Sequence, residues 1–125
     1  MSCTLSHVEN FLTYLKHYAA RDIVSISTVL ADDVTLRDWN MAVVGKAAVL
    51  AETARNFAAV QSIAIQVLHL HESTDAVAGE LKITLDAKTE LFVVDVIAFN
   101  ADGRIRSVRA YLGRGDAERP GPGPD

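Results

Sequence analysis

The chain has 125 residues, and 50% of them are hydrophobic, which is enough for one compact domain whose core needs no disulfide or structural metal. Its 12 Lys and Arg and 16 Asp and Glu residues are spread along the chain with a net charge of −4, so no basic face indicates a nucleic-acid-binding protein. No secretory signal or bilayer-spanning run of roughly 20 apolar residues is visible, and Cys3 is the only cysteine, so we expect a cytoplasmic protein that does not contact membranes.

The first predicted element is a helix. Ser6 and Glu9 have the spacing of a capping box, which marks a helix start. Apolar residues then recur at helical spacing over residues 8–19. Tyr14 and Tyr18 lie beside this apolar stripe, where their rings can pack while their hydroxyl groups reach a cavity or water.

A second helix and a short strand are predicted next. Asp22 is a candidate N-cap for a helix that runs through residue 30 and is closed by the acidic pair at 32–33. Residues 34–38 alternate between apolar and polar types, which predicts a strand. Asp38 continues the parity that faces the interior.

A third helix and a series of strands complete the chain. Gly45 precedes an alanine-rich segment at 46–57 that is predicted to be helical. The short connections between the β-rich runs that follow predict an antiparallel meander. These runs, separated by turn-forming residues, lie at 61–71, 76–86, 90–99 and 104–112.

This order, with helices before strands, predicts a single α+β domain over residues 1–116. The N-terminal helices would pack on a curved, mostly antiparallel sheet and enclose a deep apolar pocket. Residues 117–125 are rich in Pro and Gly, and we expect this tail to be disordered.

Asp95 lies in the middle of the most apolar run, residues 91–99. Apolar residues of both parities indicate a strand that is covered on both faces, where an isolated carboxylate is costly. One interpretation is a structural carboxylate tied to an arginine of a neighbouring strand or to backbone amides. The other is an acid whose raised pKa lets it donate a hydrogen bond into the pocket.

Asp38 and Tyr14 each allow two interpretations as well. A carboxylate on the inward parity, followed by Trp39, could be a general base, or Asp38 could cap a solvated turn after the strand has ended. The hydroxyl group of Tyr14 could point into a cavity or reach out to water.

His69 and His71 share a parity with the apolar residues Ile63, Ile65 and Val67, so both are expected to face inward. Two histidines at this spacing on a strand can bind a metal ion. The sequence offers no clear further ligands, and we expect neither a metal nor a cofactor.

Together these features resemble the NTF2-like superfamily, also called SnoaL-like, and within it the ketosteroid isomerases. The resemblance covers about residues 8–114. It rests on the helix end at 18–22, the junction at 30–35, Gly45 at the start of the third helix, and the closing stretches at 99–105 and 109–112. It implies a cone-shaped sheet wrapped by helices, a hydrophobic small-molecule ligand and a homodimer formed through the exposed sheet face.

The resemblance also implies roles for individual residues. The family's oxyanion-hole tyrosine falls on Tyr14, its general-base aspartate on Asp38, and its protonated aspartate on Asp95. The implied activity is that of a steroid Δ-isomerase, which transfers a proton along an allylic system next to a carbonyl. The side chains expected to contact the flat hydrophobic ligand are Tyr18, Trp39, Phe57 and Leu112.

The chain departs from the well-known steroid enzymes at several positions. Its segment between Asp38 and Gly45 is shorter. Leu30 and Thr53 occupy positions at which some of those enzymes carry tyrosines that support the oxyanion tyrosine, and Leu112 replaces a frequent aromatic residue. These changes leave the substrate class open.

Two other functions fit the same frame. Another SnoaL-like enzyme, of the polyketide cyclase, dehydratase or epoxide hydrolase type, would be favoured by His69 or His71 facing Asp38. A non-catalytic ligand-binding or dimerisation module predicts a solvated Asp38 and a salt-bridged Asp95.

Overall fold

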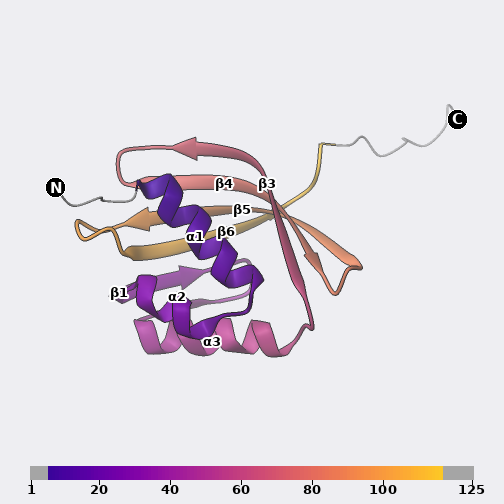
Figure 1. Ribbon diagram of the computed structural model, residues 1–125, viewed down its shortest axis with the longest axis horizontal. Coiled ribbons are helices and arrows are strands. Elements are labelled where there is room, and N and C mark those ends of the chain that lie inside the picture. The colour runs from indigo at the N-terminus through magenta and orange to yellow at the C-terminus, as the bar shows by residue number, and fades with distance from the viewer. Residues whose placement is uncertain (1–5, 117–125) are drawn as a thin grey trace, which may run out of the picture.

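Three helices and six strands make up residues 6–116, the part of the chain that the computed structural model describes (Figure 1). The helices are α1 (His7–Ala19), α2 (Ile23–Val29) and α3 (Lys46–Ala58). The strands are β1 (Leu30–Arg37), β2 (Ala42–Val44), β3 (Ile63–Glu72), β4 (Ala76–Leu85), β5 (Thr89–Phe99) and β6 (Ile105–Gly113). Cys3 and the tail predicted at 117–125 lie outside the described residues.

The strands form one sheet in the order β2-β1-β6-β5-β4-β3. The predicted antiparallel meander from β3 to β6 is confirmed, and β1 joins it as a parallel neighbour of β6. The α+β class with a mostly antiparallel sheet is therefore confirmed. The short strand β2 was not predicted, because its three residues carry too little alternation and it forms by pairing with the edge of β1.

Both predicted helix N-caps are present. The hydroxyl group of Ser6 accepts a hydrogen bond from the backbone N–H of Glu9 at 3.1 Å. The carboxylate of Asp22 accepts one from the N–H of Ser25 at the same distance and begins α2. Each cap pairs an N–H group that has no partner inside its helix.

The second helix ends earlier than the sequence predicted. α2 stops at Val29, and Leu30 is already a strand residue that pairs with Ile105 of β6. Leu30 is fully buried, whereas Asp32 and Asp33 are exposed along β1. The prediction that the acidic pair closes the helix was wrong, because burial of Leu30 in the sheet outweighs the weak helical propensity of the segment.

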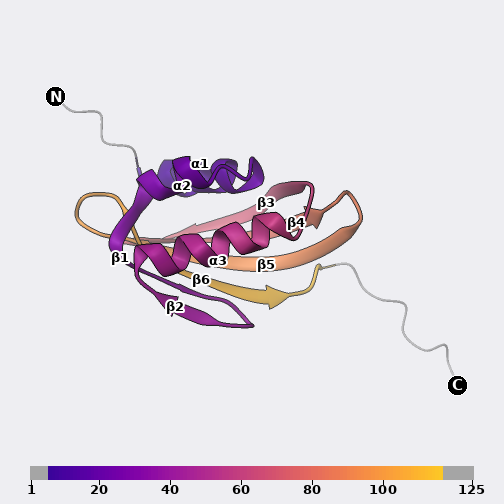
Figure 2. The same cartoon turned by 90° about the horizontal axis from the view of Figure 1, so that it is seen from below.

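The helices lie on one face of the sheet (Figures 1 and 2). α1 packs on β3 and β4, and α3 packs on β1 and β2, so the two helices cover opposite halves of the sheet. The other face carries no helix within the described residues. The core between the layers contains the fully buried side chains Phe11, Ile26, Leu30, Val34, Val77, Leu81, Ile97 and Ile105.

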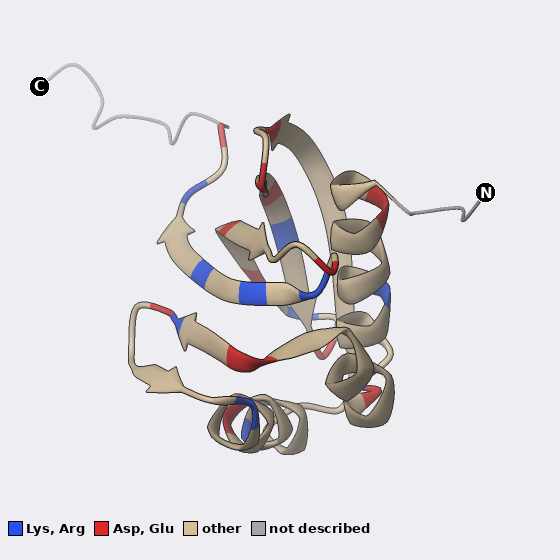
Figure 3. Ribbon diagram, turned by 90° about the vertical axis from the view of Figure 1, so that its left-hand side faces the viewer, with Lys and Arg blue, Asp and Glu red and all other residues tan. Residues whose placement is uncertain are grey.

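Charged residues are interspersed by sign along the described ribbon (Figure 3). The strand β6 carries arginines and its neighbour β1 carries both acidic residues and Arg37, the partner of Arg109, and no described helix or strand carries a run of basic residues. None of the described helices combines the length and the hydropathy needed to cross a membrane.

Candidate functional site

A cavity of about 270 Å³ lies between the helices and the inner face of the sheet. Tyr14 of α1, Asp38 at the end of β1 and Asp95 of β5 all line it, although they are far apart in the sequence. Most of the remaining wall is aliphatic and includes Leu15, Leu36, Ile63, Ile65, Ile83, Leu85, Leu91, Val93 and Val108.

Tyr14 is held by α1 with its side chain toward the sheet, and only 5% of its surface is exposed. Burial raises the pKa of Tyr14 well above its ordinary range, and the neighbouring Tyr18 hydroxyl and Asp95 carboxylate add to this effect. No described group forms a hydrogen bond with the hydroxyl. Tyr14 therefore stays protonated and has a free O–H donor at the cavity.

Asp38 follows β1 directly and caps the turn into β2. Its Oδ1 atom accepts hydrogen bonds from the backbone N–H groups of Asn40 at 2.7 Å and Met41 at 3.0 Å. This is the turn-capping role, but Asp38 is also half-buried and lines the cavity. The two roles are compatible, because Oδ2 forms no hydrogen bond with the described residues.

Asp95 lies in the centre of β5, between Gly79 of β4 and Ala110 of β6. Neither neighbour has a side chain that can pair with a carboxylate. Within residues 6–116 the carboxyl group has no hydrogen bond and no ion pair. The arginine or backbone amides that the structural interpretation of Asp95 requires are therefore not observed among these residues. Burial raises the pKa of Asp95 from 3.8 to about 7, which keeps the acid protonated well above its usual range.

Tyr18 and Asn56 form a polar pair on the cavity wall. The side-chain amide of Asn56 in α3 donates to the Tyr18 hydroxyl oxygen at 3.4 Å. Asn56 was not among the residues predicted to line the site. It lies on the alanine-rich helix α3, and no local sequence pattern indicates which polar residue of this helix faces the cavity.

Two of the expected ligand contacts are placed elsewhere. Phe57 is 7% exposed and packs edge-on against Tyr18 with ring centroids 4.9 Å apart, so it supports the wall from behind. Leu112 is 49% exposed near the end of β6 and does not line the cavity. Trp39 does line it, and its 44% exposure places it at the mouth.

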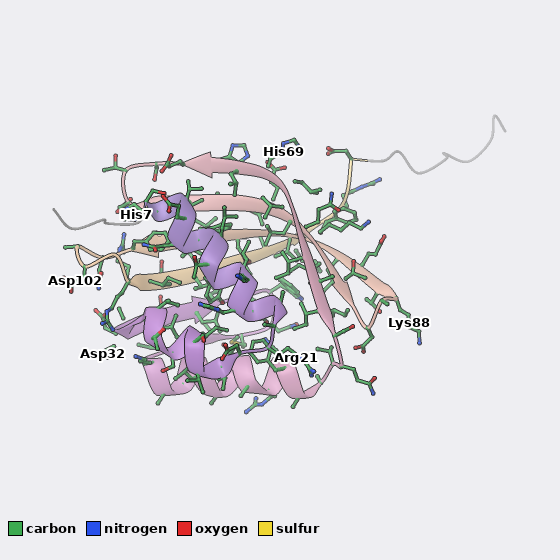
Figure 4. The ribbon with its side chains drawn as sticks, in the orientation of Figure 1. His7, Arg21, Asp32, His69, Lys88 and Asp102 are labelled. Atoms are coloured by element: carbon green, nitrogen blue, oxygen red, sulfur yellow. The ribbon has the colours of Figure 1, made fainter. Side chains whose placement is uncertain are left out.

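His69 and His71 do not face the cavity, which corrects the prediction from their parity. The β3–β4 register shifts between Val67 and His69, so a β-bulge moves the residues beyond it to the opposite faces. Both histidines are exposed, and His71 contacts Glu80 on the outer face. Figure 4 shows His69 at the margin of the molecule.

Among the described residues, no three of His, Cys, Asp and Glu cluster closely enough to hold a metal ion. The titratable groups of the cavity are Tyr14, Tyr18, Asp38 and Asp95. With this arrangement, Tyr14 and protonated Asp95 can donate hydrogen bonds to an oxygen atom of a ligand, and the Asp38 carboxylate can accept a proton from it.

Comparisons with known proteins agree with this description. A SnoaL-like domain family profile matches residues 11–108. A steroid Δ-isomerase of Nocardioides simplex is 32% identical over 108 residues, an alignment that covers 82% of this chain and 86% of that protein.

Solved structures show the same fold at low sequence identity. An NTF2-like protein of Cytophaga hutchinsonii, of unknown function, superimposes with a TM-score of 0.75 at 12% identity, covering 90% of this chain and 95% of that one. The epoxide hydrolase/cyclase-like enzyme SalBIII, with a role in pyran ring formation in salinomycin, gives 0.75 at 21% identity, covering 86% and 90%.

Proposed function

The chain belongs to the SnoaL-like domain family, and we propose that it is a ketosteroid-isomerase-like enzyme, which transfers a proton along an allylic system next to a carbonyl group. The observation that carries this proposal is the convergence of Tyr14, Asp38 and Asp95 on one largely apolar cavity. The substrate is a hydrophobic small molecule, and no cofactor takes part.

Asp38 is the general base of the proposed reaction. Its carboxylate removes a proton from the carbon next to the carbonyl, and the C–H electron pair moves into the ring system to form a dienolate. The same carboxyl group returns the proton to the far carbon of the allylic system, so a C–H bond breaks, another forms and the double bond becomes conjugated. The two backbone bonds to Oδ1 hold the carboxylate while Oδ2 carries the proton.

Tyr14 and protonated Asp95 donate hydrogen bonds to the carbonyl oxygen as it becomes negatively charged. Donors fixed in a site that excludes water are worth more than in solution, because no reorganisation is needed when the charge develops. Burial raises the pKa values of both groups, so Tyr14 holds its proton at neutral pH and Asp95, with a pKa of about 7, holds its proton up to about that pH.

The cavity sets the character of the substrate. A volume of about 270 Å³ lies near the lower end of the roughly 300–1,000 Å³ typical of ligand pockets. The reacting ring and its neighbours occupy the aliphatic interior, and the rest of a larger substrate extends past Trp39 at the mouth.

The alternative functions receive less support from the observed geometry. Exposed His69 and His71 lie away from Asp38, so the feature that would favour a cyclase or hydrolase is missing from the described cavity. A binding module would have a solvated Asp38 and a salt-bridged Asp95, but Asp38 is half-buried and Asp95 has no ion pair within residues 6–116.

The test is ultraviolet detection of conjugated-enone formation from a 5-ene-3-ketosteroid. We expect Asp38→Asn to lower kcat by about 10²–10⁴, because asparagine keeps the turn bonds but cannot take a proton. Tyr14→Phe should lower kcat by up to about 10²–10³. Asp102→Asn, in the exposed β5–β6 turn, is the matched control and should keep parental activity (Figure 4). Absence of turnover in the folded parent protein would reject steroid isomerisation.

A further inference from the structure

We propose that Tyr18, oriented by Asn56, is a third hydrogen-bond donor to the ligand oxygen that Tyr14 and Asp95 bind. The inference rests on the proposed function, since it assumes that an oxygen atom of the ligand gains negative charge in this cavity. The roles proposed for Tyr14, Asp38 and Asp95 do not explain why Tyr18 and Asn56 form a hydrogen bond at the wall of the same cavity.

The hydrogen bond from Asn56 determines which way the Tyr18 proton can point. The Asn56 amide occupies one acceptor position of the Tyr18 oxygen, at 3.4 Å, and an amide N–H cannot accept the hydroxyl proton in return. No other group among residues 6–116 accepts that proton. Because Tyr18 lines the cavity, its O–H group is left available to a ligand.

Packing holds the Tyr18 ring in place. Phe57 contacts it edge-on at a centroid distance of 4.9 Å, and the Tyr14 ring lies 6.0 Å away at an interplanar angle of 52°. Tyr14 and Tyr18 are four residues apart on α1, so they lie on the same face of the helix one turn apart. A ring held in this way loses little entropy when its hydroxyl group binds a ligand.

The hydroxyl groups of Tyr14 and Tyr18 are also electrostatic neighbours. Tyr18 raises the pKa of Tyr14 more than Asp95 does. Burial raises the pKa of Tyr18 itself, and this effect outweighs the hydrogen bond from Asn56, which lowers the pKa; the carboxylates of Asp95 and Asp38 add smaller contributions that raise it. Tyr18 therefore stays protonated, and its hydroxyl group is near enough to Asp95 and Asp38 for both carboxylates to affect its pKa.

Such a donor would compensate for a departure of this chain from its relatives. Leu30 and Thr53 occupy the positions expected to support the oxyanion tyrosine, yet Leu30 is buried in the core and the Thr53 hydroxyl donates to the backbone oxygen of Val49. Neither can assist Tyr14. In this chain the Tyr18 hydroxyl, one helical turn further along α1, would add a hydrogen bond to the ligand oxygen itself instead of supporting Tyr14.

The experiment uses 4-nitrophenol as a probe, because its phenolate oxygen resembles the oxygen of a dienolate and absorbs visible light only when ionised. Binding is titrated against pH for the parent, Tyr18→Phe, Asn56→Leu and the double variant. We expect Tyr18→Phe to weaken phenolate binding about 10-fold and to raise the pH midpoint of the bound probe by about one unit. Asn56→Leu should weaken binding less, and the double variant should match Tyr18→Phe, because Asn56 acts through Tyr18.

Two controls separate hydrogen bonding from packing. Nitrobenzene has the same ring without the hydroxyl group, and its affinity, measured by competition, should be the same in Tyr18→Phe and the parent. Tyr111→Phe removes a phenol hydroxyl that bonds to Arg37 on the outer face and should leave phenolate binding unchanged. Equal losses for nitrobenzene and nitrophenolate in Tyr18→Phe, or no loss for nitrophenolate, would overturn the proposal.

Phenolate binding and steroid turnover together distinguish the donor role of Tyr18 from the isomerase function. If the parent does not isomerise the steroid but Tyr18→Phe weakens phenolate binding alone, the donor role stands and the isomerase function fails. If the parent turns over the steroid while phenolate binding and its pH midpoint are the same in Tyr18→Phe, the donor role fails and the isomerase function stands.

Discussion

Asp95 is an acidic residue at a place where a negative charge is costly. The surrounding strand is apolar, its ladder neighbours are Gly79 and Ala110, and burial raises its pKa to about 7. The unfolded chain loses this proton near the ordinary value of 3.8, so the folded protein binds more protons than the unfolded chain between these two values. Stability must then fall as the pH rises through this interval.

We therefore expect the free energy of unfolding to fall by about 2–4 kcal/mol between pH 4 and pH 7 through Asp95, and to change little through this group above pH 7. Asp95→Asn keeps the shape of the side chain and removes the titration, so the variant should lack this contribution and be more stable than the parent at pH 8. Urea unfolding across this pH range measures it. Parallel pH profiles of the two proteins would contradict the expectation.

The same titration should affect catalysis. A protonated Asp95 donates a hydrogen bond to the developing enolate, whereas an ionised Asp95 repels it. Isomerase activity should therefore fall as the pH rises through about 7, while Asp95→Asn, which keeps an N–H donor, should lose this decline. A pH–rate profile of kcat for both proteins checks the expectation, and an unchanged decline in the variant would assign it to another group.

The contact between α1 and β4 depends on a glycine. A Cβ atom at Gly79 would lie 2.4 Å from Cζ and 2.8 Å from Cε1 of Phe11, whose ring is fully buried. The absence of a side chain at Gly79 lets α1 lie close to the sheet. Because Gly79 pairs with Asp95 in the β4–β5 ladder, the helix that carries Tyr14 is brought close to the strand that carries Asp95.

Gly79→Ala should therefore destabilise the protein by about 1–3 kcal/mol, since the buried Phe11 ring has to move. Gly113→Ala is the matched control, because its Cβ atom would meet only the Phe92 oxygen at 3.7 Å and should cost little. Denaturant unfolding of both variants compares them. Combining Gly79→Ala with Phe11→Leu should recover part of the loss, and no recovery would mean that the clash lies elsewhere.

The irregularity in β3 shows how one element can reverse a prediction. Alternation from Ile63 through His71 predicts that both histidines face inward, and it is correct as far as Val67. The bulge that follows adds a residue opposite β4, so His69 pairs with Glu80 and faces outward. Because the bulge arises from pairing between strands, periodicity within one strand does not predict it.

The molecule as a whole has one helix-covered sheet face and one face that no described helix covers. Alternation along β5 and β6 directs Val94, Val96 and Tyr111 to this outer face, opposite the cavity residues. An exposed face with apolar side chains is typical of a surface that pairs with another protein. We propose that the chain forms a homodimer through this face, as the family resemblance implies.

Sedimentation equilibrium at micromolar concentration should then give twice the chain mass of 13.5 kDa. Val96→Glu, which places a charge on the outer face, should shift the protein toward the monomer while the cavity still binds 4-nitrophenol. A parent that sediments as a monomer would reject the dimer. A variant that remains dimeric would mean that the interface lies elsewhere.

The amino-acid sequence alone predicted the three helices, the caps of α1 and α2, the antiparallel meander and the family, because these depend on local spacing, capping and turn-forming residues. It did not predict β2. It also indicated Tyr14, Asp38 and Asp95 as candidate site residues, because Tyr14 lies beside the apolar stripe of α1, Asp38 continues the inward-facing side of β1 and Asp95 lies within an apolar strand.

Which side chains share the cavity became clear only from the three-dimensional arrangement of the elements. It brought Asn56 to Tyr18, placed Phe57 behind the wall and left Leu112 outside. The physical reason is that a cavity is formed where helices and curved strands from distant parts of the chain fail to fill the space between them. That space depends on strand register, sheet curvature and the closeness of α1 to β4, and none of these is encoded within a single segment.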